Sequence, residues 1–446
     1  MKRILPSISK ILLLVLCLVP MLAFAGARED YKEAQSLLVA ARACLAIYND
    51  RAGKLSTEYL KQDGWEIEPY IQPGELDDAR FLIAKKELGD GSQPIYLLAI
   101  VGTETSKNIK TDLKMHRVYF AGHTLEEFTA SAALKNIPDS EPKVHLGFHN
   151  YVQTALKAKS AEHDNRGKLL TELLLENADR KIYLTGHSLG GAVATLTGAR
   201  LLSMGVKPEQ VEVISFGAPA VGNQAFVDVA SPKLRVTRVV IDGDPVTGVL
   251  QTLSDYKQFG REVKWVSSDK THKGQHAMVG YLDTAIKNFY QKREQAEQEG
   301  QAELIPQSAV TGNTAKVYVM PAKNYLTEDL KSEFWYMQQG VVDNYRLLLP
   351  NAVFADADAE PLPLKRAAEM GCRWLIVPEI SAHKLKNERN LYYITLQQTV
   401  YDTANGKIIY FNNNSTSTAS VTPLEALLHN IREIGAETGK WLEDPK

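Results

Sequence analysis

Cysteine is scarce in this 446-residue sequence, which contains only three. That number excludes a disulfide scaffold and a cysteine-rich zinc module. An excess of one charge is also missing: the formal net charge is -2 at pH 7, which gives no electrostatic basis for binding nucleic acid or an anionic membrane surface. Hydrophobic residues make up 44% of the chain, as in an ordinary folded protein. The length then predicts two or three domains rather than one core.

The first 25 residues have the pattern of a secretory signal peptide. Three basic residues precede an apolar run over residues 11–25, which ends in Ala23-Phe24-Ala25. The run is shorter than the roughly 18–20 apolar residues of a membrane span, and Pro20 interrupts it. We therefore predict that residues 1–25 are a signal peptide, with an uncleaved membrane anchor as the alternative.

Only Cys44 and Cys372 remain once a signal peptide is removed. They lie in different predicted domains, so two buried free thiols are favoured over a disulfide, although the sequence leaves their pairing open. An exported protein that does without disulfides is more typical of bacteria than of fungi. The predicted location is therefore periplasmic or secreted.

Alternating strand and helix patterns predict an α/β protein. Four apolar runs have the composition of strands buried on both faces of a sheet, and helical patterns separate them. These runs cover residues 95–101, 181–185, 211–216 and 234–241. An amphipathic helix over 29–50 and two short strands, over 65–70 and 79–85, precede them. This order predicts a parallel sheet with helices on both faces.

A polar segment follows this pattern and divides the chain. Residues 291–312 are rich in Gln and Glu and are predicted to be a linker. Residues 313–446 then have the patterns of a second, smaller α/β domain, of an ordinary size for one core. Within it, Asn405-Gly406 between two strand patterns is a strong hairpin signal.

One motif indicates chemistry. Directly after the strand over 181–185, Gly186-His187-Ser188-Leu189-Gly190-Gly191 precedes a helical pattern. A serine at such a sharp strand-to-helix turn has an exposed hydroxyl, and the flanking glycines permit the turn. Ser188 is therefore predicted to be a nucleophile. A serine hydroxyl needs a base to accept its proton and an acid to orient that base.

The candidate base and acid follow from the chain order Ser, Asp, His that accompanies this kind of turn. Of the ten histidines, only His272 and His276 lie between Ser188 and the linker. The turn after the strand over 234–241 contains Asp242 and Asp244. Either aspartate can also act only as a turn former, so the residues alone leave two candidates for each role.

Further motifs follow one another in a specific order. They are Val101-Gly102-Thr103, Ser106 with Asp112-Leu113, Val144-His145-Leu146-Gly147-Phe148, Ser215-Phe216-Gly217-Ala218-Pro219, Val221-Gly222-Asn223, Asp244-Pro245-Val246, and His276-Ala277-Met278 with Tyr281. With the Ser188 motif, this set resembles the class 3 (fungal-type) lipases of the α/β-hydrolase superfamily over about residues 30–290.

The resemblance implies an α/β-hydrolase domain of the class 3 lipase type over residues 26–290. It implies Asp244 as the acid and His276 as the base. It also implies that the backbone N–H groups of Leu189 and Thr103 form the oxyanion hole. The family has Arg before Gly-Thr where this chain has Val101, a departure that affects packing behind the strand rather than the two donors.

The family also implies a lid after Thr103, and here residues 106–114 contain few large apolar side chains. A thin lid predicts activity on short-chain or partly soluble esters. His145 and His149 have the i, i+4 spacing of a metal pair, but no neighbouring carboxylate completes a metalloprotease motif. His145 matches the family's His-x-Gly-Phe segment, so a structural role is expected, and no metal or cofactor is predicted.

The predicted function is that of a serine carboxylic-ester hydrolase, a lipase or esterase that cleaves acyl esters of lipids through an acyl-enzyme intermediate. Phospholipase A or thioesterase activity is the close alternative, because a triad does not select its acyl donor. An envelope interaction protein with a vestigial hydrolase fold is the alternative from another class.

The C-terminal residues 313–446 loosely resemble α/β domains of bacterial envelope proteins, such as penicillin-binding-protein activators and curli-export lipoproteins. That resemblance implies an envelope protein as a partner. Neither a nucleic acid partner nor a transmembrane span in the mature chain is expected.

Overall fold

A computed structural model describes residues 8–48, 50–71, 80–102, 116–157, 159, 167–253, 255–267, 275–301, 316–349, 351–355, 362–385 and 391–443. Contacts within the chain divide it into two units. We call Ser36–Ala285 the central unit, and Met1–Gln35 with Ile286–Lys446 the flanking unit.

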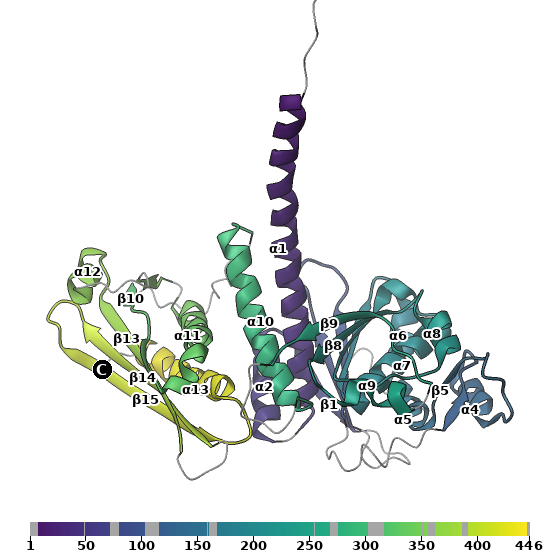
Figure 1. Cartoon of the computed structure of the whole chain (residues 1–446). Helices are drawn as coiled ribbons and strands as arrows, with labels where there is room; N and C mark the ends of the chain where they lie inside the picture. Colours follow the sequence, from purple (N-terminus) through teal and green to yellow (C-terminus); the bar gives the residue numbers. More distant parts are fainter. Residues whose placement is uncertain are drawn as a thin grey trace, which may run out of the picture. The chain divides into compact units, whose positions relative to one another are not determined.

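A seven-stranded sheet organises the central unit, in the order β1-β2-β3-β6-β7-β8-β9. Figure 1 labels its strands β1, β8 and β9. The strands are β1 (Glu66–Ile71), β2 (Arg80–Lys86), β3 (Ile95–Ile100), β6 (Lys181–His187), β7 (Val211–Phe216), β8 (Arg235–Ile241) and β9 (Arg261–Trp265). The first three pair antiparallel, and the strands from β3 to β9 pair parallel. The predicted α/β class with a largely parallel sheet is thus confirmed.

Helices bury both faces of this sheet, as β3 demonstrates. Tyr96, Leu98 and Ile100 lie in one hydrophobic cluster, whereas Leu97 and Ala99 lie in the other, because successive residues of a strand point to opposite faces. The first cluster includes residues of α5 (Leu146–Leu156), α6 (Leu170–Glu176), α7 (Leu189–Ser203), α8 (Gln224–Ala230) and α9 (Val246–Leu253). The second includes residues of α1 (Ile8–Ala46) and α2 (Arg51–Gln62).

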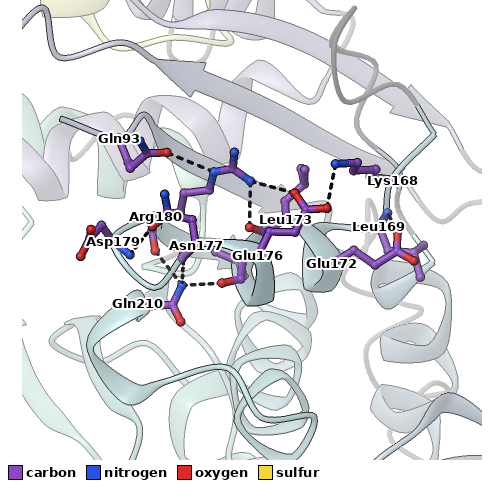
Figure 2. A network of polar contacts seen from close by, with 11 residues as sticks. Gln93, Lys168, Leu169, Glu172, Leu173, Glu176, Asn177, Asp179, Arg180 and Gln210 are labelled. Atoms are coloured by element: carbon purple, nitrogen blue, oxygen red, sulfur yellow. Dashed lines mark hydrogen bonds and ion pairs between the residues drawn. The ribbon is translucent and has the colours of Figure 1, made fainter. Parts of the chain in front are cut away.

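A polar network ties together the amino ends of β3, β6 and β7 (Figure 2). Arg180, just before β6, donates through Nε to Gln93 Oε1 at 3.3 Å and through Nη1 to the Leu173 carbonyl at 3.0 Å. Gln210, just before β7, donates through Nε2 to three carbonyl oxygens, those of Leu174, Asn177 and Arg180. These bonds link the amino ends of the three strands to the segments that precede them.

The structure contains short strands that the sequence did not predict. They are β4 (Arg117–Tyr119) and β5 (Lys143–His145), which pair with each other, and β9 at the edge of the sheet. Each is short and contains charged residues, so none has the apolar run that identified the buried strands. A further helix, α4 (Leu125–Ala133), lies between β4 and β5 in the sequence.

Helix α1 continues through part of the predicted signal peptide, because residues 8–25 are helical and contiguous with the predicted amphipathic helix. Cleavage after residue 25 stays a prediction. Within the part of the chain that the structure describes, no helix combines the length and the apolar character needed to cross a membrane.

The flanking unit contains a second sheet, in the order β12-β10-β13-β14-β15, with β11 paired to β13. The strands are β10 (Val317–Val319), β11 (Lys323–Leu326), β12 (Val353–Phe354), β13 (Trp374–Lys384), β14 (Tyr392–Asp402) and β15 (Ile408–Thr418). The turn at Gly406, whose φ is +70°, joins β14 to β15 as the hairpin signal predicted. The sequence missed β11, a four-residue strand with one buried side chain.

The helices of the flanking unit are α11 (Phe334–Leu348), α12 (Pro363–Glu369), α13 (Pro423–Glu443) and the larger part of α10 (Met278–Gln298). Helix α13 packs against β14 and β15, where Gln398 donates to Thr438 at 3.0 Å. Helix α10 extends eight residues past the predicted end of the first domain, because Arg293 is buried in an ion pair with Asp343 at 2.6 Å. Residues 302–312 of the predicted linker lie outside the described residues.

Both cysteines that follow the predicted signal peptide are buried free thiols. Cys44 Sγ lies 3.4 Å from Thr185 Oγ1, and burial raises the pKa of this thiol to about 12. Burial also raises the pKa of Cys372.

We predict that iodoacetamide at mildly alkaline pH leaves Cys44 unmodified in the native protein and alkylates it fully in urea without reductant. Alkylation requires the thiolate, which the buried site disfavours. Mass spectrometry of the Cys44 peptide measures the difference, and Cys44→Ser identifies that peptide. Equal modification in both states would contradict the burial, and no modification in urea would indicate a disulfide.

Candidate active site

Ser188 lies in the turn between β6 and α7 with an unusual backbone. Its φ is +56° and its ψ is -126°, a conformation that non-glycine residues rarely adopt. Close packing explains the glycines around it: a Cβ at Gly186 would lie 2.3 Å from the Gly190 carbonyl carbon, and one at Gly190 would lie 2.2 Å from the Ile100 carbonyl oxygen. The turn therefore presents the serine hydroxyl at the carboxyl end of β6.

The structure brings three of the predicted residues into one hydrogen-bonded row. His276 Nε2 lies 2.8 Å from Ser188 Oγ, and His276 Nδ1 lies 2.9 Å from Asp244 Oδ2. Asp244 follows β8, and His276 precedes α10, so separate segments supply each side chain at the same edge of the sheet. This row can move a proton from the serine to the imidazole while the carboxylate fixes the tautomer.

Of the competing candidates, Asp242 makes a different contact and His272 lies outside the described residues. Asp242 Oδ1 lies 2.7 Å from Lys264 Nζ, at the protein surface. This hydrogen bond and the lysine charge lower the pKa of Asp242. Asp244 is therefore the aspartate that touches His276.

Tyr281, on α10, forms a hydrogen bond with Asp244. Its hydroxyl donates to Asp244 Oδ2 at 2.7 Å and accepts from the Ile241 backbone N–H at 3.1 Å. Burial, with the Asp244 charge as a second cause, raises the pKa of Tyr281, so its hydroxyl remains a donor. The Val246 N–H donates to Asp244 Oδ1 at 2.9 Å. The sequence identified Tyr281 only as part of a family motif and gave it no role.

Because Gly217 has no side chain, Asp244 and His276 can occupy the space beside it. Its φ is +56°, and a Cβ there would lie 2.7 Å from Asp244 Oδ2 and 3.2 Å from His276 Nδ1. Its N–H donates to the Val239 carbonyl at 2.9 Å. The family motif Ser215-Phe216-Gly217 thus has a local steric cause.

His187, the residue before the candidate nucleophile, packs on the candidate base. The ring centroids of His187 and His276 are 4.6 Å apart. Burial lowers the pKa of His187 to about 3, and the charge of His276 acts in the same direction. His187 is therefore an uncharged ring beside the candidate base.

The predicted oxyanion donors are only partly described. Leu189 is the first residue of α7, where backbone N–H groups lack an earlier partner within the helix. Thr103 and the predicted lid, residues 106–114, lie outside the described residues. The described chain does reach the turn at Gly102, where a Cβ would lie 3.6 Å from Ser188 Cβ.

His145 and His149 have separate environments. His145 begins α5, and its Nδ1 accepts from the Gly147 and Phe148 N–H groups at 3.1 and 3.4 Å. Burial, and then the Arg200 charge, lowers the pKa of His149 to about 4. Across the described ranges, no three His, Cys, Asp or Glu side chains form a group able to hold a metal ion.

The parallel sheet and the strand-turn-helix at Ser188 define an α/β-hydrolase fold. Residues 97–253 match the family described as Lipase (class 3). This segment contains Ser188 and Asp244, and the predicted resemblance is thereby confirmed.

Two plant proteins are among the relatives. The chain is 32% identical over 117 residues to phospholipase A(1) DAD1, chloroplastic, of Arabidopsis thaliana, a match that covers 26% of each chain. It is 31% identical over 153 residues to phospholipase A1 EG1, chloroplastic/mitochondrial, of Oryza sativa subsp. indica, covering 31% of this chain and 34% of the relative. The chain therefore spans about a third or less of the length of these relatives.

Among solved structures, lipase II from Rhizopus niveus is 20% identical, with a TM-score of 0.39. That comparison covers 55% of this chain and 83% of the Rhizopus chain.

We predict that Tyr281→Phe lowers kcat for an ester substrate about tenfold and leaves KM nearly unchanged. The variant removes one charge-assisted hydrogen bond that orients Asp244. The activation free energy is expected to rise by about 1.4 kcal/mol, which corresponds to a tenfold lower rate. Steady-state kinetics measures this effect.

Tyr256→Phe is the matched control, because Tyr256 is buried in the same unit and its hydroxyl has no hydrogen-bond partner among the described residues. An unchanged kcat in Tyr281→Phe would show that Asp244 is held without the tyrosine.

Proposed function

We propose that the chain is a serine carboxylic-ester hydrolase that cleaves acyl esters of lipids. The observation that carries this proposal is the 2.8 Å contact between Ser188 Oγ and His276 Nε2, with Asp244 on the other side of the same imidazole. The class 3 lipase match over residues 97–253 supports the choice of an ester as substrate.

The proposed reaction proceeds in two halves. In the first, Ser188 Oγ attacks the ester carbonyl carbon while His276 Nε2 takes the hydroxyl proton, and Asp244 stabilises the imidazolium. The negative charge on the carbonyl oxygen is stabilised by the N–H of Leu189 and, by family resemblance, of Thr103. Loss of one such donor typically costs on the order of 3 kcal/mol in the transition state.

Collapse of this intermediate breaks the bond to the alcohol, which leaves with the proton from His276. In the second half, water attacks the acyl-enzyme and gives its proton to His276. The carboxylic acid then leaves, and Ser188 recovers its proton. His187 contributes a neutral surface, which avoids placing a second positive charge next to the imidazolium.

The location and the role of the C-terminal residues belong to the same proposal. Export rests on the pattern of residues 1–25, and the partner-binding role of residues 313–446 rests on the loose resemblance to envelope domains. The described part of that segment contributes no residue to the row of Ser188, His276 and Asp244.

We predict that a fluorophosphonate probe labels the folded protein at Ser188 and that Ser188→Ala abolishes labelling. In addition, Asp244→Asn should lower kcat by about 10⁴-fold, because the neutral amide does not stabilise the imidazolium and can hold the imidazole in the wrong tautomer. Asp242→Asn is the matched control and should retain full activity, since Asp242 pairs with Lys264 instead. Folded protein that resists the probe would favour an interaction protein with a vestigial hydrolase fold.

A second experiment addresses the substrate class. The few large apolar residues in the segment 106–114 predict the highest kcat/KM for short-chain p-nitrophenyl esters. The same panel should include phospholipids, triacylglycerol emulsions and acyl thioesters, since curated relatives are named as phospholipases A1 and lipases. A sharp rise in rate above the solubility limit of the substrate would contradict the short-chain prediction.

A further inference from the structure

His187 lies between the proposed nucleophile and the ring of the proposed base. It is the last residue of β6, directly before Ser188, and its backbone pairs with Phe216 on β7. Its ring centroid is 4.6 Å from that of His276 and 5.8 Å from that of Tyr281. The planes of the two imidazoles are inclined by 36°, so the rings pack more face to face than edge to face. His187 therefore contacts the base from the strand that carries the nucleophile.

The hydrogen bonds of His276 act only in the plane of its ring. Nε2 lies 2.8 Å from Ser188 Oγ, and Nδ1 lies 2.9 Å from Asp244 Oδ2. Hydrogen bonds tolerate bending of roughly 30° before they weaken, so these two alone restrain movement out of the ring plane only loosely. A contact on the face of the imidazole restrains that movement directly. The His187 ring provides such a contact.

His187 is suited to this place because it stays uncharged. Burial lowers its pKa to about 3, and the charge of His276 acts in the same direction. The charge of Asp244 and a main-chain hydrogen bond with His276 are smaller causes, and they oppose the shift. In the proposed reaction His276 becomes an imidazolium, and a neutral ring neither repels that charge nor takes the proton. The contact can therefore persist in both protonation states of the base.

We propose that His187 is a positioning residue, whose ring holds the His276 imidazole in line with Ser188 Oγ and Asp244. This inference rests on the proposed function, because it assigns a role within the same ester cleavage. The ring carries the role rather than hydrogen bonding through Nε2, since that atom has no hydrogen-bond partner among the described residues.

Two substitutions separate the ring from its hydrogen bond. His187→Phe keeps a planar ring and removes the hydrogen bond, whereas His187→Asn keeps an amide that can form one but has no ring. We expect His187→Asn to lower kcat for a p-nitrophenyl ester about tenfold and to leave KM nearly unchanged, because a displaced base slows proton transfer without changing substrate binding. His187→Phe should stay within about threefold of the wild-type kcat.

A second readout does not depend on ester cleavage. The proton between His276 Nδ1 and Asp244 gives a downfield NMR resonance, which His276→Ala identifies by its loss. Exchange with water broadens this resonance when the ring moves, so it should be sharp in the wild-type protein and in His187→Phe and broad in His187→Asn. A wild-type protein that shows the sharp resonance but cleaves no ester contradicts the proposed function, while the resonance of the variants still tests the positioning.

His149→Asn is the matched control, because His149 is also a buried histidine whose pKa burial lowers, to about 4, and it lies on α5. This variant should keep the wild-type kcat and the sharp resonance, whatever its Tm. If His187→Asn does not fold, His187→Leu fills the same space without a ring and should be equally slow.

Two results would overturn the proposal. One is a wild-type kcat with an equally sharp resonance in His187→Asn or His187→Leu. The other is a His187→Phe variant that folds but is as slow as His187→Asn, which would assign the effect to the hydrogen bond instead of the ring.

Discussion

The strained backbone of Ser188 is the constraint on which the rest of the site depends. A non-glycine residue at a φ of +56° costs on the order of 1–3 kcal/mol, and it persists only where the surroundings fix it. Here the Ser188 N–H donates to the Phe216 carbonyl at 2.9 Å, and Gly190 packs on the carbonyl of Ile100. The strain is therefore held by the two strands that flank β6.

The polar groups at the amino ends of the strands differ in their partners from those at the carboxyl ends. At the amino ends of β3, β6 and β7, Arg180 and Gln210 donate hydrogen bonds to backbone carbonyl groups, which link these strand ends to the preceding segments (Figure 2). At the carboxyl ends, the polar groups of Ser188 and His276 point at one another and at the site of reaction. Asp244 accepts from His276, Tyr281 and Val246, and these donors offset the burial of its carboxylate.

The sequence predicted those structural features that depend on residues close together in the chain. The apolar run at β3 and the glycines around Ser188 are visible in the sequence, because they reflect a periodic and a steric rule. Asp244 and His276 were selected over Asp242 and His272 by the family resemblance. The strands β9 and β11 were missed since an edge strand needs no apolar run. The contacts of Tyr281 were missed because they depend on partners distant in the sequence, on β8 and in the turn after it. Thr103 and the lid lie outside the described residues, so that part of the site rests on family resemblance.

The row of Ser188, Asp244 and His276 also has a consequence for biosynthesis. Ser188 and His276 are separated by 88 residues, and the base comes last in the chain. A growing polypeptide therefore contains the proposed nucleophile long before the proposed base. Under the proposed function, a chain that ends before the start of α10 contains Ser188 and Asp244 but has no His276 to take the proton, so the proposed ester cleavage waits for the completion of this segment.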